Sequence, residues 1–349
     1  MLAQADAERL VTSTAIRAPA FRLVRDGAPL PPAAYAEDLP WQPAAFTATA
    51  RVDRVAQEFA AGATIVLQAL HFSWLPTARY CRRLEQALGL PVQANAYLTP
   101  SSAQGFAVHH DVHDVFVLQV AGRKRWRIYT PVLELPLRSQ RWSPALGDPG
   151  APVQELVLEP GDTLYVPRGW PHEATTGDGE SLHVTVGLHP PTRAEALRAA
   201  LDATAAADVE LRRGAAAGLP AGLLGRLDAE LAPERVAARA RRRFVLTRRP
   251  ILEDQLDQVR RLDALHATVP VERRDTVIAD LHRTRDGGAV LVFEGKEVRV
   301  PAVAHEPLAA MQAASGTFTA RALPGALDEA GRLVLVRRLV REGYLRIAG

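Results

Sequence analysis

From about residue 60 to residue 190 the chain consists of short runs of β-branched and aromatic residues, separated by Gly, Pro, Asp and Ser. Such runs predict β-strands; they occur in ATIVLQAL, VQANAYLT, DVFVLQVAGRKRWRIYT, VQELVLEPGDTLYVP and SLHVTVGLH. One helix is predicted among them, over TARYCRRLEQALGL. Because helical crossovers do not otherwise alternate with the strands, the pattern predicts an antiparallel sandwich or barrel rather than a parallel sheet.

The pattern changes at Pro190 to a helical periodicity. TRAEALRAALDATAAAD opens with Thr192 and Glu195, the spacing of a capping box. ILEDQLDQVRRLDALH carries an apolar face made of Leu252, Leu256, Val259, Leu262 and Leu265. We therefore expect a helical segment over residues 191–265, whose apolar stripes form an inter-helix core or a dimer interface.

The last segment, residues 266–349, mixes both patterns. AVLVFEGKEVRVP predicts a hairpin that turns near Gly295, and LDEAGRLVLVRRLVREGYLRI predicts a helix ending at Gly343 and a short strand. Helices with a small hairpin are typical of a winged-helix-like module. Its helix RLVLVRRLVREG is too apolar to be an obvious reader of a DNA groove, so a structural or protein-contact role is expected.

Composition limits the possible functions. The formal net charge of the 349 residues is only +3, which argues against nucleic acid as the primary partner; the arginine run between Arg239 and Arg249 is expected to be a solvated face. No apolar run is long enough for a membrane span and no basic-apolar leader opens the chain, so a cytoplasmic location is expected. Cys81 is the single cysteine, so any metal must be held by His and carboxylate.

Histidine is concentrated in VHHDVHDVF, residues 108–116. In an extended strand His109 and Asp111 point to the same side, and a third ligand must come from elsewhere. EPGDTLYVPRGWPHEA supplies His172 beyond a bend, and in a barrel the end of a later strand can lie beside the start of an earlier one. Two histidines and one carboxylate with open positions form the site of non-heme Fe(II) oxygenases. The local triad of His109, Asp111 and His113 is the competing interpretation.

Other polar residues follow the same alternation. His110 is expected to face away from the metal, at the surface or behind the ligands, and His183 is expected to be a hydrogen-bonded core histidine. After Gly122 the alternation turns Lys124 inward with Trp126 and Ile128, and turns three arginines outward. A buried ammonium without a counter-charge is costly. Lys124 therefore either extends to solvent at the rim of the barrel or pairs with a structural carboxylate. The alternative is that it binds an anionic co-substrate.

These residues resemble a known family. NAYLTPSSAQGFAVHHDVHDVFVLQVAGRKRWRIY, GDTLYVPRGWPHEATT and SLHVTVG are similar to the JmjC-type cupin 2-oxoglutarate oxygenases, and within them to the ribosomal oxygenase branch. The resemblance implies an α+β protein: a double-stranded β-helix (cupin/JmjC) catalytic domain over residues 1–190, a helical dimerisation segment over 191–265 and a winged-helix-like domain over 266–349. The aromatic-rich opening of the branch is not recognisable in this chain, so the substrate-side walls remain unassigned.

The resemblance also implies residue roles. His109, Asp111 and His172 would be the Fe(II) ligands, and Lys124 would pair with the distal carboxylate of 2-oxoglutarate. Asn95, Tyr97 and Thr185 would line the co-substrate pocket. The expected activity is hydroxylation by O2 of a protein side chain, on a ribosomal protein, by a homodimer. A peptide natural product or small molecule as target, a demethylase outcome, and a non-catalytic metal-binding cupin with a regulatory winged helix are the alternatives.

Overall fold

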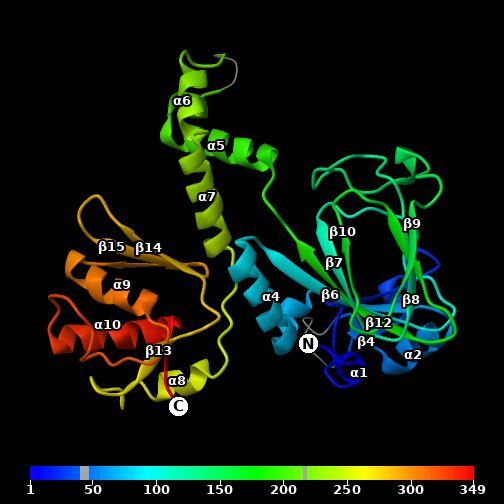
Figure 1. The fold of residues 1–349 in the computed structure, drawn as a ribbon, viewed down its shortest axis with the longest axis horizontal. Coiled ribbons are helices and arrows are strands. Elements are labelled where there is room, and N and C mark those ends of the chain that lie inside the picture. The colour runs from blue at the N-terminus through cyan, green and yellow to red at the C-terminus, as the bar shows by residue number, and fades with distance from the viewer. Residues whose placement is uncertain (40–46, 215–217) are drawn as a thin grey trace. The chain divides into compact units, whose positions relative to one another are not determined.

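The computed structural model describes residues 1–39, 47–214 and 218–349. The chain divides into two compact units, Met1–Pro190 and Pro191–Gly349 (Figure 1). The first is built mainly from strands and the second from helices with small sheets. In the described part of the chain, no helix combines the length and the apolar character that crossing a membrane requires.

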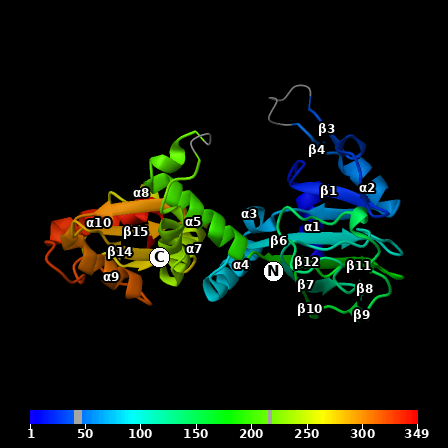
Figure 2. The same ribbon diagram turned by 90° about the horizontal axis from the view of Figure 1, so that it is seen from above.

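Two antiparallel sheets form the first unit within the described residues (Figure 2). The larger one has the order β10 (Thr163–Val166), β7 (Asp114–Ala121), β12 (Ser181–Leu188), β6 (Val92–Thr99), β5 (Thr64–Leu67), β1 (Phe21–Arg25), β2 (Ala28–Pro29). The smaller one has the order β11 (His172–Thr175), β8 (Lys124–Ile128), β9 (Gln154–Leu158). A separate short pair joins β3 (Ala36–Glu37) to β4 (Thr49–Ala50). The expectation of antiparallel pairing is confirmed.

Apolar side chains form two hydrophobic cores in this unit. One face of the larger sheet packs against α1 (Gln4–Thr12), α2 (Val52–Ala60), α3 (Leu70–Ser73) and α4 (Leu75–Leu88). A second core joins the two sheets and consists of Val115, Val117, Trp126, Ile128, Leu158 and Val166. Alternation in β6 and β12 sends their apolar residues to the first core and leaves polar residues, such as Asn95, Tyr97 and Thr185, on the opposite face.

The second unit begins with the predicted capping box. Thr192 caps α5 (Arg193–Ala207) by accepting the Glu195 N–H, while the Glu195 carboxylate accepts from the Thr192 N–H. Helices α6 (Leu223–Glu230), α7 (Pro233–Leu246) and α8 (Gln255–Arg260) follow. The expectation of one amphipathic helix over 251–266 is wrong, because α8 has only 6 residues and Leu256 is 76% exposed.

The end of the chain contains the expected hairpin and helix. Strands β14 (Ala279–Arg283), β15 (Ala289–Phe293) and β16 (Lys296–Val300) form one sheet, and β13 (Val271–Arg273) pairs with β17 (Leu345–Ile347). The turn uses Glu294 and Gly295, both at positive φ, as two-residue hairpin turns require. Helices α9 (His305–Ala313) and α10 (Glu329–Glu342) pack on these strands, and α10 ends at left-handed Gly343.

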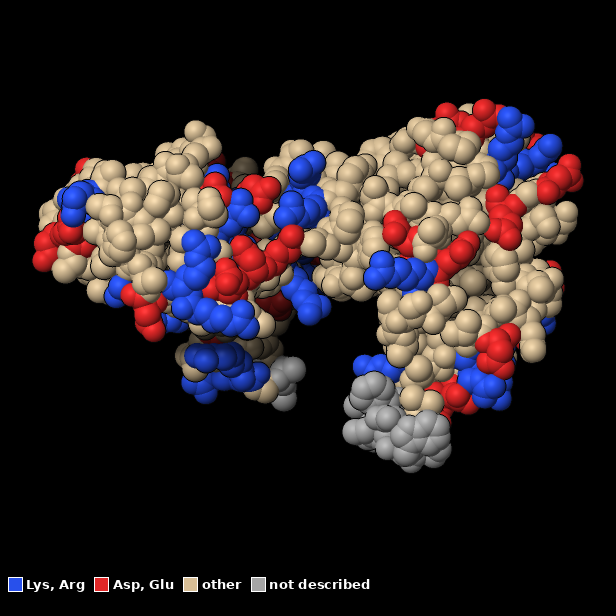
Figure 3. All heavy atoms as spheres, turned by 90° about the horizontal axis from the view of Figure 1, so that it is seen from below, with Lys and Arg blue, Asp and Glu red and all other residues tan. Residues whose placement is uncertain are grey.

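The arginine run on α7 is largely neutralised within its own unit. Arg241 makes a forked contact with Asp280, with Nη2 at 2.9 Å from the carboxylate, while Arg242 pairs with Glu297 and Arg239 with Glu230. Positive and negative side chains are interspersed on the face shown in Figure 3. The structure therefore agrees with a solvated, ion-paired face.

Candidate metal centre

Backbone hydrogen bonds join the two segments that carry the predicted ligands. The His172 N–H donates to the His109 carbonyl at 2.8 Å, and the His109 N–H donates back at 3.2 Å. The Gly169 N–H, in the bend before His172, donates to the Asp111 carbonyl at 3.0 Å. The Asp114 carboxylate accepts from the Arg168 N–H of the same bend at 3.0 Å. These hydrogen bonds therefore hold the two motifs side by side as one local unit.

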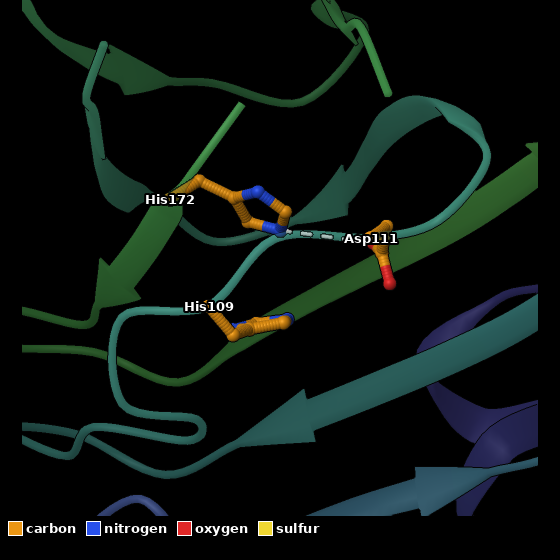
Figure 4. A group of neighbouring side chains, drawn as sticks. All are labelled: His109, Asp111 and His172. Atoms are coloured by element: carbon orange, nitrogen blue, oxygen red, sulfur yellow. Dashed lines mark ion pairs between the residues drawn. The ribbon is translucent and has the colours of Figure 1, made fainter. Parts of the chain in front are cut away.

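His109, Asp111 and His172 converge on a shared space (Figure 4). One potential ligand atom from each lies within 4.8 Å of the others, and His172 Nε2 is 3.8 Å from Asp111 Oδ2. In each histidine Nδ1 faces a backbone carbonyl two residues earlier, at 2.9 Å from Ala107 and 3.0 Å from Trp170. A carbonyl only accepts, so Nδ1 carries the proton and Nε2 keeps its lone pair for a metal.

Protonation also suits metal binding. Burial lowers the pKa of His172 to about 4, so this imidazole is neutral at neutral pH. Burial raises the pKa of the Asp111 carboxyl, but His172 and His109 lower it, and the balance leaves that pKa below its ordinary value. A neutral His172 imidazole and an ionised Asp111 carboxylate are in the protonation states that bind a divalent ion such as Fe(II). The Asp111 side chain is 37% exposed and that of His172 only 8%, so the site opens toward solvent at Asp111.

The structure separates the other histidines of the cluster from this group. His113 contacts Gln93 through Nε2 at 2.9 Å and packs on His189, with ring centroids 4.5 Å apart. The competing triad with His113 is therefore wrong, since His172 completes the group. His110 does face away from the site but is not a surface residue: it is 4% exposed, and its Nε2 donates to the Gln140 carbonyl at 3.1 Å.

Lys124 points into the barrel, as the alternation predicted. It is 3% exposed, and its Nζ donates to Thr99 Oγ1 at 2.7 Å. Among the residues that the structure describes, Lys124 has no carboxylate partner. Burial lowers the pKa of its ammonium to about 7, which is the expected effect of a low-dielectric surrounding on an uncompensated positive charge.

The three predicted pocket residues lie on β6 and β12 beside the ligand group. Thr185 pairs with Asn95, and His183 pairs with Tyr97, across the two strands. Burial raises the pKa of the Tyr97 hydroxyl and the Asp111 charge raises it further, while hydrogen bonding to Thr185 and Asn95 lowers it. Tyr97 therefore lies between Asn95 and Thr185 on one side and the predicted ligand Asp111 on the other. Asn95 is itself oriented by the Ala69 N–H, which donates to its Oδ1 at 2.9 Å.

His183 differs from the expectation of a hydrogen-bonded core residue. It is 3% exposed, and its buried Nδ1 has no hydrogen-bond partner among the described residues. Its ring stacks on Tyr97 at 4.7 Å and meets Trp126 edge-on at 5.4 Å. Burial and the nearby Lys124 charge hold its pKa well below the ordinary value. The ring is a neutral aromatic group packed between Tyr97 and Trp126 rather than part of a polar network.

Two polar residues near the site, Thr99 and Glu173, were not predicted from the sequence. Thr99 is the partner of Lys124, and it also accepts from Thr64 Oγ1 at 3.1 Å; its same-face spacing with Tyr97 could have identified it. Glu173, which follows a ligand, accepts from the Tyr129 hydroxyl at 2.6 Å and from Gln104 Nε2 at 2.9 Å. Glu173 thereby ties β8 and β11 to the segment that leads into His109.

Comparison with known proteins agrees with this architecture. Residues 67–196 match the JmjC domain family model. A segment of 110 residues is 48% identical to the bifunctional lysine-specific demethylase and histidyl-hydroxylase NO66 of Drosophila persimilis, covering 31% of this chain and 16% of that protein. A segment of 142 residues is 44% identical to ribosomal oxygenase 1 of Homo sapiens, covering 38% of this chain and 22% of that protein. The matches thus span less than a quarter of these relatives.

Solved structures extend the similarity to the whole fold. The X-ray structure of E. coli YcfD matches over 99% of this chain and 91% of its own, with a TM-score of 0.58 and 18% identity. A structure titled as YcfD, a ribosomal oxygenase from Escherichia coli in complex with cobalt and 2-oxoglutarate, matches over 100% and 91%, with a TM-score of 0.54 and 19% identity. Residues 67–196 of this chain therefore match the JmjC domain family, and a segment of the chain is similar to ribosomal oxygenase 1.

Proposed function

We propose that this protein is an Fe(II)- and 2-oxoglutarate-dependent oxygenase that hydroxylates a protein side chain. The observation that carries the proposal is the convergence of His109, Asp111 and His172 beside Lys124, a buried cation that lacks a carboxylate partner among the described residues. When bound, the ferrous ion would supply chelation of the keto acid and activation of O2, so that one oxygen atom enters a C–H bond and the other enters succinate, while the carboxylate next to the keto group leaves as CO2.

The chain's own residues would orient the co-substrate and hold water away from it. Lys124, positioned by Thr99, would bind the distal carboxylate in a charge-assisted contact. Asn95, Tyr97 and Thr185 would line the space between that carboxylate and Asp111. The His183 ring, Trp126 and Ile128 would exclude water from the inner end.

A ribosomal protein is the target class that we propose. The support is the similarity to relatives named as a ribosomal oxygenase and a histidyl-hydroxylase. Such a target would place the enzyme in the cytoplasm, with its ribosomes. We further propose that α5 and α6 form a homodimer interface, because Leu197, Leu201 and Leu224 are 48%, 46% and 80% exposed, and that residues 266–349 are a winged-helix-like module for protein contact.

The first test measures cofactor binding and turnover with the full chain. Purified protein loaded with Co(II) is expected to change its visible absorption when 2-oxoglutarate is added, and the Fe(II) form is expected to release succinate. His172→Ala should abolish both signals, because it removes one of three ligands. His282→Ala, at an exposed position of the second unit, is the matched control and should keep them. Absence of 2-oxoglutarate binding to wild-type protein would refute the proposal.

The second test identifies the target. Mass spectrometry of ribosomal proteins from wild-type and deletion cells is expected to show one protein that lacks a single added oxygen atom in the deletion strain. Restoration by the wild-type gene but not by His172→Ala would assign the modification to this site. Identical masses of the ribosomal proteins in both strains would refute the proposal of a ribosomal target. The oxygenase activity itself is decided by the first test.

A further inference from the structure

A second cation, Arg22 on β1, faces the interior of the barrel. Strand register pairs Arg22 with Val66 of β5 and pairs Val66 with Tyr97 of β6. Paired residues of antiparallel strands project to the same face, so Arg22 shares a face with Tyr97. Arg25, three positions later, lies on the opposite face by alternation and forms an ion pair with Glu58 at 2.8 Å.

The guanidinium of Arg22 has no polar partner within residues 1–39, 47–214 and 218–349. Its Nε is buried without a hydrogen-bond acceptor, and no hydrogen bond or ion pair of Arg22 is found among the described residues. An orphaned buried N–H is costly, and a guanidinium presents its N–H groups as a fork suited to a carboxylate or carbonyl oxygen. An oxygen acceptor supplied by a ligand would satisfy it.

Phe106 holds the Arg22 side chain next to the ligand group. The Arg22 Cζ lies 5.0 Å from the centre of the Phe106 ring, a cation–π distance. The same ring is 5.4 Å from that of His109 and 6.0 Å from that of Tyr97. The Arg22 charge also reaches the Tyr97 hydroxyl, where it acts against the effect of Asp111 on the pKa. Arg22 is thus joined to the metal centre through one aromatic ring.

The position of Arg22 is distinct from that of the co-substrate cation. Lys124 is bonded to Thr99, and Thr99 to Thr64 of β5. Thr64 and Val66, the neighbour of Arg22, lie two residues apart on one strand, about 7 Å along its axis. Lys124 already provides the charge for the distal carboxylate of 2-oxoglutarate. A second carboxylate-binding group at this separation is therefore expected to bind a different molecule.

We propose that Arg22 binds an oxygen acceptor of the peptide target, either a side-chain carboxylate or a main-chain carbonyl, and so determines which residue reaches the metal centre. This inference rests on the proposed function. Arg22 is then a specificity residue on the substrate side of the site, with Phe106 as the platform that keeps its guanidinium in place.

The experiment uses the full chain loaded with Mn(II) and 2-oxoglutarate without O2, and an array of overlapping peptides that tiles the ribosomal proteins of the source organism. Arg22→Gln is expected to weaken binding of the selected peptides at least about tenfold, the loss expected for one charge-assisted hydrogen bond. Arg22→Lys should recover part of that loss, because it restores the charge without the fork. Arg25→Gln, on the same strand, is the matched control and should bind the peptides as wild type does.

A second arm distinguishes the two acceptors. Each Asp or Glu of a selected peptide is changed to Asn or Gln: if one such change weakens wild-type binding but adds nothing to the loss in Arg22→Gln, the acceptor is that carboxylate. If no such change matters while Arg22→Gln still weakens binding, the acceptor is a main-chain carbonyl. Thermal unfolding of each variant checks that the fold is retained.

Three results would overturn the inference: wild-type peptide affinity in Arg22→Gln, loss of 2-oxoglutarate affinity in that variant to the same degree, or an array in which the wild-type protein selects no peptide. Failure of the proposed function is seen separately, as a Co(II) absorption spectrum that 2-oxoglutarate leaves unchanged. The two failures therefore have different signatures.

Discussion

At the scale of single residues, the site depends on polar side chains that are placed in apolar surroundings with few partners. Lys124 is the clearest case, because its ammonium is buried and bonded to Thr99. Burial lowers its pKa to about 7, so above that pH the free protein holds a mostly neutral amine. An arriving dicarboxylate favours the charged form and raises the pKa again.

The lowered pKa of Lys124 predicts proton uptake when the co-substrate binds. At pH 8 the binding of 2-oxoglutarate to metal-loaded protein should take up nearly one proton, and at pH 6, where Lys124 is already charged, it should take up almost none. Calorimetry in buffers of different ionisation enthalpy measures this number. The sign follows from the lowered pKa of Lys124, about 7 in the free protein.

Lys124→Met is expected to bind 2-oxoglutarate more weakly and without the uptake at pH 8. Lys296→Met, at a lysine that pairs with Glu342 in the second unit, should keep both the affinity and the uptake. If Lys124→Met takes up the same proton as wild type, the titrating group is another residue and the role of Lys124 is wrong.

At the scale of elements, tight connections place the functional strands. Gly122 lies in the turn between β7 and β8, two positions before Lys124, with φ +64. A Cβ at this position would lie 1.8 Å from the Glu180 carbonyl oxygen and 3.1 Å from the Ser181 Cα. The turn can therefore be close to β12 only because this residue has no side chain.

Gly122→Ala should lower the free energy of unfolding strongly. Left-handed backbone costs a non-glycine residue about 1–2 kcal/mol, and the overlap with Glu180 adds about 1–3 kcal/mol. Gly161→Ala is the matched control, because its φ is +101 but nothing lies within 4 Å of the added Cβ; it should show only the smaller backbone cost. Urea unfolding compares the two, and equal losses would contradict the close approach at Gly122.

At the scale of the whole molecule, exposed leucines on α5 and α6 form the proposed homodimer interface. Leu197 and Leu201 are one helical turn apart on α5, and each is close to half exposed. Residues four apart share a helix face, and exposed leucines on one face favour association with a second copy.

We predict a homodimer that this face controls. Light scattering coupled to size exclusion should give the mass of two chains for the wild type, and the double change Leu197→Glu with Leu201→Glu should give the mass of one. Val334→Glu, on α10 at a side chain that is 66% exposed, is the control and should remain dimeric. A dimeric double variant would place the interface elsewhere on the chain. A monomeric wild type would refute the homodimer.

Much of this protein follows from local sequence pattern alone. Strand alternation turned Lys124 inward, because successive side chains of a strand take opposite faces whatever the fold around them. The capping box at Thr192, the hairpin turn at Gly295 and the helix end at Gly343 are equally local, since each depends on hydrogen bonds or backbone angles within a few residues.

Only the tertiary structure decided which distant groups meet. His113 has the same strand parity as Asp111, yet His172 completes the group, because the backbone bridge between residues 109 and 172 brings the two segments together. The inward orientation of Arg22 depends on the register of β1 on β5. Helix α8 has only 6 residues, although the helical pattern of apolar residues in the sequence extends further on both sides. Local patterns determine which way a side chain points, but cross-strand register and packing decide what it touches.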